Sequence, residues 1–347
     1  MHSHLLEFPM PTCLMPTCLM PTRRTLALTA VLATALVSCL GAAPALAQDN
    51  YPTKPITLVV PYPPGGSNDV FARQIAKELA DALKQAVVVD NRPGASGTTG
   101  TAAVTRAPAD GYTLVALSSS MTTNAAIQSR LPFDPVKDLA PVAMLAEGPF
   151  IVAVSNSFAA RTPTELIAAI RARPGQYNYA TSGTGSVNQF GTELLKAQAG
   201  KLFITHIPYR GMGPAVTDLI SGQVQMLMAS GPSILPMVRA GRVRAIGITS
   251  LKPSPIAPEL TPMASAVPGY DFALWWGVFA PAGTPAAVVN KLNAAINQTL
   301  AKPSIKTQFL NEGAEAKPMS PAQFAGVVAA DIERWKALAR QQNIAAD

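Results

Sequence analysis

Two short segments rich in glycine have the composition of an anion-binding loop. Residues 64–66 (Pro-Gly-Gly) precede Ser67, and residues 182–185 (Ser-Gly-Thr-Gly) precede Ser186. Glycine lets the backbone approach a ligand closely, and the first amide groups of a helix that follows point back at the loop. Because a helix N-terminus carries roughly half a positive charge, each segment could bind a carboxylate. The same composition also suits an ordinary strand-to-helix connection, and both interpretations stay open here.

The sequence supplies little for other kinds of chemistry. All three cysteines and two of the three histidines lie within residues 1–39, which leaves His206 as the one histidine of the remaining chain. That remainder can form no disulfide, thiolate metal site or iron–sulfur cluster. His206 lies in an apolar run that predicts a strand, where a structural histidine is commoner than a catalytic base. We therefore expect no enzymatic activity, with an α/β hydrolase as the alternative.

Composition and charge narrow the class further. The chain of 347 residues is 48% hydrophobic and 14% charged, which is too apolar for a disordered protein. Lys and Arg number 27 against 20 Asp and Glu, for a net charge of +7. These basic residues are dispersed, with no run and no interleaved aromatic residues, so the charge does not predict a nucleic-acid partner.

The N-terminal segment has the features of an export signal. Arg23 and Arg24 precede an apolar stretch over residues 26–40, and residues 45–47 (Ala-Leu-Ala) have the small-x-small pattern of a cleavage site. We expect residues 1–47 to be removed and the protein to be periplasmic. Cys39 lies in a weak lipobox, so a lipoprotein that begins there is the alternative.

Alternating strands and helices would position the two loops. Short apolar runs predict strands, and residues 56–62 and 177–180 are the two that precede the glycine-rich segments. Apolar residues at helical spacing predict helices that begin at Ser67 and Ser186, with each serine as N-cap. Asp69, in the first turn, could stabilise the helix dipole or face a ligand. The alternation predicts open, mostly parallel sheets flanked by helices, and about 300 residues are enough for two lobes.

A series of motifs follows the whole chain in a fixed order: YPTKPI (51–56), VPYPPGGSND (60–69), VDNRPG (89–94), ADGYTL (109–114), LPFDP (131–135), IPYRG (207–211), PAVTDL (214–219) and FAPAGTP (279–285). These stretches resemble the Bug family, the extracytoplasmic solute-binding receptors of tripartite tricarboxylate transporters. The resemblance covers residues 51–344.

The resemblance implies a two-lobed, type II-like periplasmic binding protein, or Venus flytrap. Residues 51–150 and 273–347 would form lobe 1, and residues 151–272 would form lobe 2. The glycine-rich loops would hold a small organic mono- or dicarboxylate, largely through backbone amides and ordered water. A monomeric receptor with no cofactor would deliver it to the membrane subunits of a transporter; a sensor that docks on a receptor kinase is the alternative. The expected ligand-binding residues are Tyr62, Pro64, Gly65, Gly66, Ser67, Asp69, Ser119, Thr181, Ser182, Gly183, Thr184, Ser186, Tyr209 and Ala229.

One position departs from the family pattern. Where many relatives carry Phe-Asp-Asn, this sequence has Met228-Ala229-Ser230. Ala229 offers no carboxylate to a ligand amine or hydroxyl group. The departure therefore favours a less polar organic acid, which could be aromatic, over an amino acid.

Overall fold

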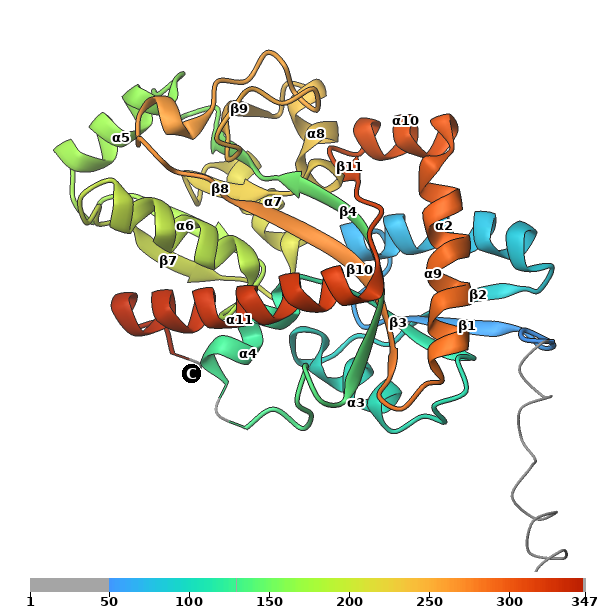
Figure 1. Cartoon of the computed structure of the whole chain (residues 1–347). Coiled ribbons are helices and arrows are strands. Elements are labelled where there is room, and N and C mark those ends of the chain that lie inside the picture. The colour runs from blue at the N-terminus through green and yellow to red at the C-terminus, as the bar shows by residue number, and fades with distance from the viewer. Residues whose placement is uncertain (1–49, 129, 346–347) are drawn as a thin grey trace, which may run out of the picture. The chain divides into compact units, whose positions relative to one another are not determined.

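A computed structural model describes residues 50–128 and 130–345 of the chain. The predicted export signal, residues 1–47, lies outside the described residues. Residues 51–347 form one compact unit, and the description that follows concerns this unit (Figure 1). No helix in the described ranges is both long and apolar enough to cross a membrane.

The first sheet has six strands, drawn from both ends of the unit. Their bounds are Ile56–Val60 (β1), Val87–Asn91 (β2), Thr113–Ser118 (β3), Leu139–Pro149 (β4), Ala273–Pro281 (β10) and Glu315–Ala316 (β11). They lie in the order β11-β4-β10-β3-β1-β2. The same stretches of chain form the helices Ser67–Leu83 (α2), Thr98–Thr105 (α3), Ser120–Ile127 (α4), Ala286–Ala301 (α9), Pro303–Asn311 (α10) and Pro321–Gln342 (α11), and the 3₁₀ turn Ala95–Gly97 (η1).

The second sheet has five strands, all from the middle of the chain. Their bounds are Ile151–Ser155 (β5), Asn178–Thr181 (β6), Thr205–Pro208 (β7), Met226–Ala229 (β8) and Val243–Ile248 (β9), in the order β7-β6-β8-β5-β9. The helices of this stretch are Pro163–Ala172 (α5), Val187–Gln198 (α6), Met212–Ser221 (α7) and Gly231–Arg239 (α8), followed by the 3₁₀ turn Met263–Ser265 (η2).

The two open sheets with flanking helices confirm the predicted α/β fold, but both sheets are mixed rather than mostly parallel. β1 pairs in parallel with β2 and β3, and β6 with β7 and β8. β10 is antiparallel to β3 and β4, β11 to β4, and β5 to β8 and β9. Parallel neighbours need a crossover connection, which is usually a helix. The sequence analysis did not predict β4. This strand is antiparallel to its neighbours and continues through Phe150 directly into β5, without a helix between them.

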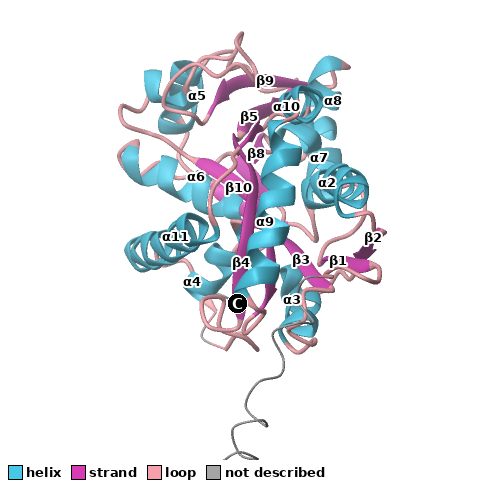
Figure 2. Ribbon diagram, turned by 45° about the vertical axis from the view of Figure 1, so that its right-hand side comes forward, coloured by secondary structure: helices cyan, strands magenta, loops and turns pink. Residues whose placement is uncertain are grey.

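Two segments connect the sheets, and Thr249 joins them. β4 and β10 lie side by side between the sheets (Figure 2). β4 leads into β5 at Phe150, and β10 starts with Ala273 opposite Pro149. The Oγ1 of Thr249 accepts a hydrogen bond from the Phe150 amide and donates one to the Phe272 carbonyl, each at 2.7 Å. Its own amide and carbonyl pair with the same two residues. Because Thr249 is fully buried, these four bonds fix the crossing point.

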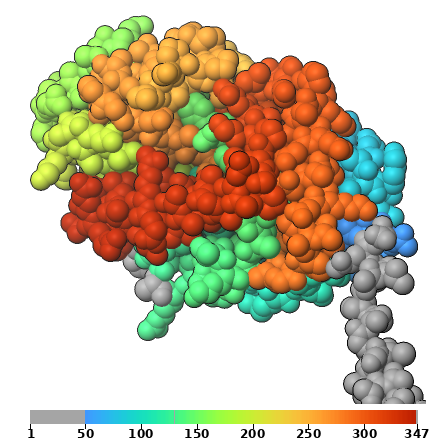
Figure 3. Space-filling model, viewed as in Figure 1, coloured from blue at the N-terminus to red at the C-terminus, as the bar shows by residue number. Residues whose placement is uncertain are grey.

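The core holds the helices that carry the loops. α2 buries Phe71, Ile75 and Leu79, spaced one helical turn apart, and the Phe71 ring lies 4.5 Å from that of Trp276 on β10. Burying a side chain of this size contributes about 1.5–3 kcal/mol. α11 packs against α4, β4 and α6 (Figure 3), with Trp335 5.8 Å from Phe190 of α6. The contact between Phe71 and Trp276 anchors the start of α2 to β10, the strand that runs between the sheets.

Candidate functional site

The first glycine-rich loop, between β1 and α2, is exposed. Pro64, Gly65 and Gly66 are all open to solvent. The N-cap of α2 is Gly66 and not Ser67 as the sequence suggested, since Ser67 is already the first helical residue. The Ser67 hydroxyl instead accepts a hydrogen bond from Nε1 of Trp276 at 3.1 Å. This hydrogen bond connects the loop to β10 through one side chain, and the two glycines stay exposed to solvent.

Asp69 holds this loop from within. Its carboxylate is buried and accepts hydrogen bonds from the Gly65 amide at 3.0 Å, from Nε of Arg73 at 2.9 Å and from Nδ2 of Asn91 at 2.9 Å. Burial opposes the charge, but these donors outweigh it and hold the pKa of Asp69 below its usual value. Asp69 is thus engaged within the protein, and its direct role is to fix the loop.

The first turn of α2 leaves donors without acceptors. Among the residues that the structure describes, none accepts a hydrogen bond from the amides of Gly66, Ser67, Asn68 and Asp69, because the first backbone bond of the helix runs from Val70 to Gly66. The first four amides of a helix have no partner inside it. With Gly65 bonded to the Asp69 carboxylate, these four amides are the ones that an anion could use.

A group of hydroxyls lies next to the loop, at the end of β3. The Tyr62 hydroxyl lies beside those of Ser118 and Ser120, and burial raises the pKa of Tyr62 to about 12. The Oγ of Ser119, the N-cap residue of α4, is buried and has no hydrogen-bond partner among the described residues. An unpaired buried hydroxyl costs about 1–3 kcal/mol, which a ligand or water can recover.

The second glycine-rich loop, between β6 and α6, is closed by its own side chains. The Ser182 hydroxyl donates to Oδ1 of Asn188 at 3.2 Å, and the Ser186 hydroxyl donates to the Gly183 carbonyl at 2.5 Å. Ser186 is the N-cap of α6 as predicted, but Gln189 does not complete a capping box with it. Oε1 of Gln189 instead accepts a hydrogen bond from the Gly185 amide at 2.7 Å. Thr184 lies between these glycines, half-buried.

His206 and Thr181 support the second loop from the neighbouring strands. Nε2 of His206 on β7 lies 2.7 Å from Oγ1 of Thr181, and Nδ1 lies 3.3 Å from Nε2 of Gln189. The imidazole stacks on the Tyr179 ring with centroids 5.0 Å apart. The strand position predicted for His206 is confirmed, and the described contacts include no serine or cysteine nucleophile beside it.

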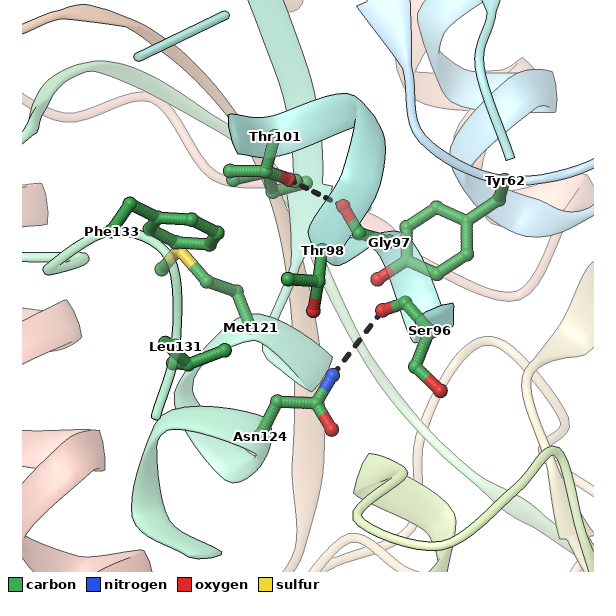
Figure 4. Close-up of a pocket in the computed structure, with 10 residues that line it drawn as sticks. Tyr62, Ser96, Gly97, Thr98, Thr101, Met121, Asn124, Leu131 and Phe133 are labelled. Carbon is green, nitrogen blue, oxygen red and sulfur yellow. Dashed lines mark hydrogen bonds between the residues drawn. The ribbon is translucent and has the colours of Figure 1, made fainter. Parts of the chain in front are cut away.

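α4 and η1 connect the two loops. A side chain at Gly185 would meet Oδ1 of Asn124 at 2.6 Å, and one at Gly183 would lie 3.8 Å from Oγ of Ser96. Nδ2 of Asn124 donates to the Ser96 carbonyl at 3.2 Å (Figure 4). η1 lies in turn against the Tyr62 ring (Figure 4). A cavity of about 10 Å³ remains between Tyr62, η1 and α4, which is room for one water molecule.

Tyr209 meets the second loop through its backbone, whereas Ala229 lies in the core of the second sheet. The Tyr209 hydroxyl donates to Oδ2 of Asp218 at 2.6 Å; burial first and this bond second raise the pKa of Tyr209 to about 12. Only the Tyr209 backbone meets the loop, through its amide to the Thr181 carbonyl. Ala229 is fully buried in an apolar cluster with Ala180 and Ile234.

Sequence reasoning missed several residues that shape the site. These are Ser96, Asn124, Asn188, Gln189 and His206 as a loop support. Asn188 and Gln189 follow Ser186 within one helical turn, so that spacing could have indicated them. Ser96 and Asn124 carry no local signal, because tertiary packing brings them to the second loop. No cluster of three metal-ligating side chains occurs in the described ranges.

Residues 71–344 match the family described as tripartite tricarboxylate transporter family receptor. The chain belongs to this family. It is 36% identical to the protein BugT of Bordetella pertussis over 308 residues, or 88% of this chain and 94% of that one. Among solved structures it is similar to R. palustris Rpa4515 with adipate (36% identity, TM-score 0.81, 85% and 99% of the chains) and to MatC from Rhodopseudomonas palustris with bound malate (32%, 0.76, 83% and 99%). The predicted Bug family membership is confirmed.

Proposed function

We propose that this receptor captures a small organic mono- or dicarboxylate in the periplasm and delivers it, as a monomer, to the membrane subunits of a tripartite tricarboxylate transporter. Family membership and the two relatives solved with adipate and malate support the class of ligand. The proposal includes removal of residues 1–47 on export. It also includes two lobes, residues 51–150 with 273–347 and residues 151–272, that close on the ligand.

The amides without an acceptor at the start of α2 carry this proposal. Gly66, Ser67, Asn68 and Asp69 present backbone donors at a glycine-flanked helix N-terminus. A hydrogen bond to a charged acceptor is worth about 1.5–3 kcal/mol, so two or three of them can offset the desolvation of one carboxylate. The unpaired hydroxyl of Ser119 and the hydroxyl of Tyr62 would add polar contacts beside them.

Ala229 bears on which carboxylate binds best. Its methyl group is fully buried in an apolar cluster, so this position offers a ligand neither a carboxylate nor an exposed surface. A polar group on a ligand therefore gains no partner here, and a hydroxyl group buried without a partner is penalised. We therefore propose that adipate binds more tightly than malate.

Calorimetry with adipate, malate, benzoate and adipamide tests the ligand class. We expect adipate to bind at least about thirtyfold more tightly than adipamide, which has the same length but no charge, because the amides of α2 need a charged acceptor. Binding of benzoate would show whether one carboxylate on an aromatic ring is sufficient for recognition. Equal affinities for adipate and adipamide would contradict carboxylate recognition at this site.

Intact mass of the exported protein tests processing separately. A chain that begins at Gln48 is the expected product of cleavage after Ala47. A diacylated species that begins at Cys39 would contradict this part of the proposal and leave ligand binding unaffected.

A further inference from the structure

A chain of side-chain hydrogen bonds runs behind the second loop, from Gly185 to Gly183. It passes through Gln189 on α6, His206 on β7 and Thr181 on β6, with consecutive distances of 2.7, 3.3, 2.7 and 3.2 Å. Three elements therefore meet at one imidazole, and the two ends of the chain are backbone groups of the loop itself.

The direction of every bond in this chain follows from its fixed ends. The Gly185 amide is a donor, so the atom of Gln189 that it meets is the carbonyl Oε1, and Nε2 of Gln189 faces His206. Nε2 of an amide can only donate, so Nδ1 of His206 must accept and carries no proton. The proton of the neutral ring is then on Nε2, which donates to Oγ1 of Thr181. Thr181 in turn donates to the Gly183 carbonyl and accepts the Gly183 amide.

We infer that His206 is a positioning residue of the carboxylate site, and that only its neutral Nε2–H form holds the second loop in its binding geometry. The inference rests on the proposed function, since the loop is taken to contact the ligand. A second ring proton would place an N–H at Nδ1 against the N–H of Gln189. Gln189 cannot turn its amide over to accept it without losing the Gly185 amide. Acid should therefore loosen the loop and weaken ligand binding.

The nearest charged groups on the described neighbouring elements are paired with each other. On β6, Tyr179 stacks on the ring at 5.0 Å and donates its hydroxyl to Glu193. On α6, Glu193 is paired with Lys196 at 2.7 Å, and both side chains are largely buried. Since the carboxylate and the ammonium group lie together, their net field at His206 is small. The Gln189 contact thus favours the form of His206 with no proton on Nδ1.

Ligand binding as a function of pH separates positioning from direct contact. A histidine gains its second proton between about pH 5 and pH 8. If His206 touched the carboxylate, that proton would strengthen binding in acid; as a loop support, it should weaken binding. We expect the affinity for adipate to fall about tenfold from about pH 7.5 to about pH 5.5. Rising or constant affinity would overturn the inference.

Three variants of the chain complete this test. His206→Gln keeps a donor near the Nε2 position and cannot titrate. Its affinity for adipate at about pH 7.5 should stay within about threefold of the unaltered chain and should vary little with pH. Any pH dependence that remains in this variant measures the protonation of adipate itself. His206→Ala should lose about tenfold at both pH values. Thr205→Ala, on an exposed neighbour in β7, is the matched control and should follow the unaltered chain. A parallel pH dependence in His206→Gln would show that another group titrates.

Nitrogen NMR of the histidine rings tests the inference without a ligand. The full chain has three histidines, and the His206 signal is the one missing from His206→Gln. We expect the Nε2–H tautomer at about pH 7.5. Gln189→Glu replaces the donor by an acceptor and should shift His206 toward the doubly protonated form. A Nδ1–H tautomer, or no change in Gln189→Glu, would overturn the assignment.

Amide hydrogen exchange of Gly185 completes the ligand-free test. At about pH 5.5 its protection should be lower in the unaltered chain than in His206→Gln, because only the former gains a ring proton. Equal protection would overturn the positioning role. If adipate and malate fail to bind at any pH while both ligand-free results hold, the proposed ligand class fails and the loop support stands.

Discussion

The β1–α2 loop and the β6–α6 loop have the same kinds of residue and satisfy their backbones differently. In each, a glycine amide donates to the side chain four residues later, Gly65 to Asp69 and Gly185 to Gln189. Asp69 is charged and paired with Arg73, and the four amides after Gly65 have no acceptor among the described residues. Gln189 is neutral and donates in turn to His206. The two loops therefore differ in the residue one turn into the helix, which ends the hydrogen-bond chain in the first loop and extends it to a neighbouring strand in the second.

The comparison also separates an open surface from a packed one. A side chain at Gly65 would meet nothing within 4 Å, whereas one at Gly185 would meet Asn124 at 2.6 Å and Ile127 at 2.7 Å. A side chain at Gly65 would therefore meet no neighbour, and its cost would come only from the φ of +85°. The second is part of the contact between α4 and α6, so its shape is set before any ligand arrives.

Gly185→Ala should give the largest effect. Gly185 has φ +80°, which costs an alanine about 1 kcal/mol or more, and its new Cβ would overpack against α4 for about 1–3 kcal/mol. We expect urea denaturation to show a loss of about 3 kcal/mol in the free energy of unfolding. Gly65→Ala is the matched control, because φ is +85° there and the space is open. An equal loss in both variants would mean that the contact with α4 contributes nothing.

Gly66→Val should abolish much of the ligand binding and lower the free energy of unfolding by no more than about 1 kcal/mol, the cost of a poorer N-cap. Gly66 has the extended angles φ −78° and ψ 168°, which valine adopts readily, and the nearest atom to a new Cβ is the Pro63 carbonyl at 3.9 Å. The isopropyl group would cover the amides of α2, so calorimetry should show affinity for adipate about thirtyfold lower, or about 2 kcal/mol. Gly213→Val, at an exposed and open position of α7, is the control. Undiminished binding would place the carboxylate elsewhere.

The sequence allowed the α/β fold and both loops to be predicted because their signals are local. Short apolar runs before glycine-rich segments marked β1 and β6, and periodic apolar residues marked α2 and α6. Strand direction is set by connections, so β4, with prolines near both ends, went unpredicted and both sheets proved mixed.

The fine structure of the site could not be predicted in the same way. Ser67 precedes Asn68 and Asp69, which fits an N-cap. Its hydroxyl instead accepts a hydrogen bond from the indole of Trp276, 209 residues away in the sequence. Ser96 and Asn124 reach the second loop through packing alone. The set of polar side chains was therefore visible locally, whereas the partner of each one depends on contacts between distant segments.

Asp69→Asn should destabilise the first loop at neutral pH. The carboxylate accepts three donors, but Arg73 is half exposed, so we expect a loss of about 1–2 kcal/mol at about pH 7. Because folding lowers the pKa of Asp69 from 3.8, its contribution is complete above that value and disappears as the pH falls further. Urea denaturation at about pH 7 and about pH 3 should show the difference from the unaltered chain shrinking in acid.

A matched variant isolates the buried position of this carboxylate. Asp81→Asn changes an exposed carboxylate on the same helix and should have little effect at either pH. If Asp69→Asn were as stable as Asp81→Asn at about pH 7, Asp69 would not hold the loop.

Tyr209→Phe should give the smallest effect and refine the boundary of the second loop. The hydroxyl of Tyr209 points to Asp218 on α7, and only its backbone meets the loop, through the amide that donates to Thr181 at 3.1 Å. Removing the hydroxyl leaves a partly exposed carboxylate to water, so stability should fall by about 0.5–1 kcal/mol. Affinity for adipate should change by less than about twofold, as in the control Tyr177→Phe, whose hydroxyl has no hydrogen bond to another described residue. A tenfold loss on calorimetry would instead place this hydroxyl at the ligand, and the second loop would then bind through side chains as well as hold its own backbone.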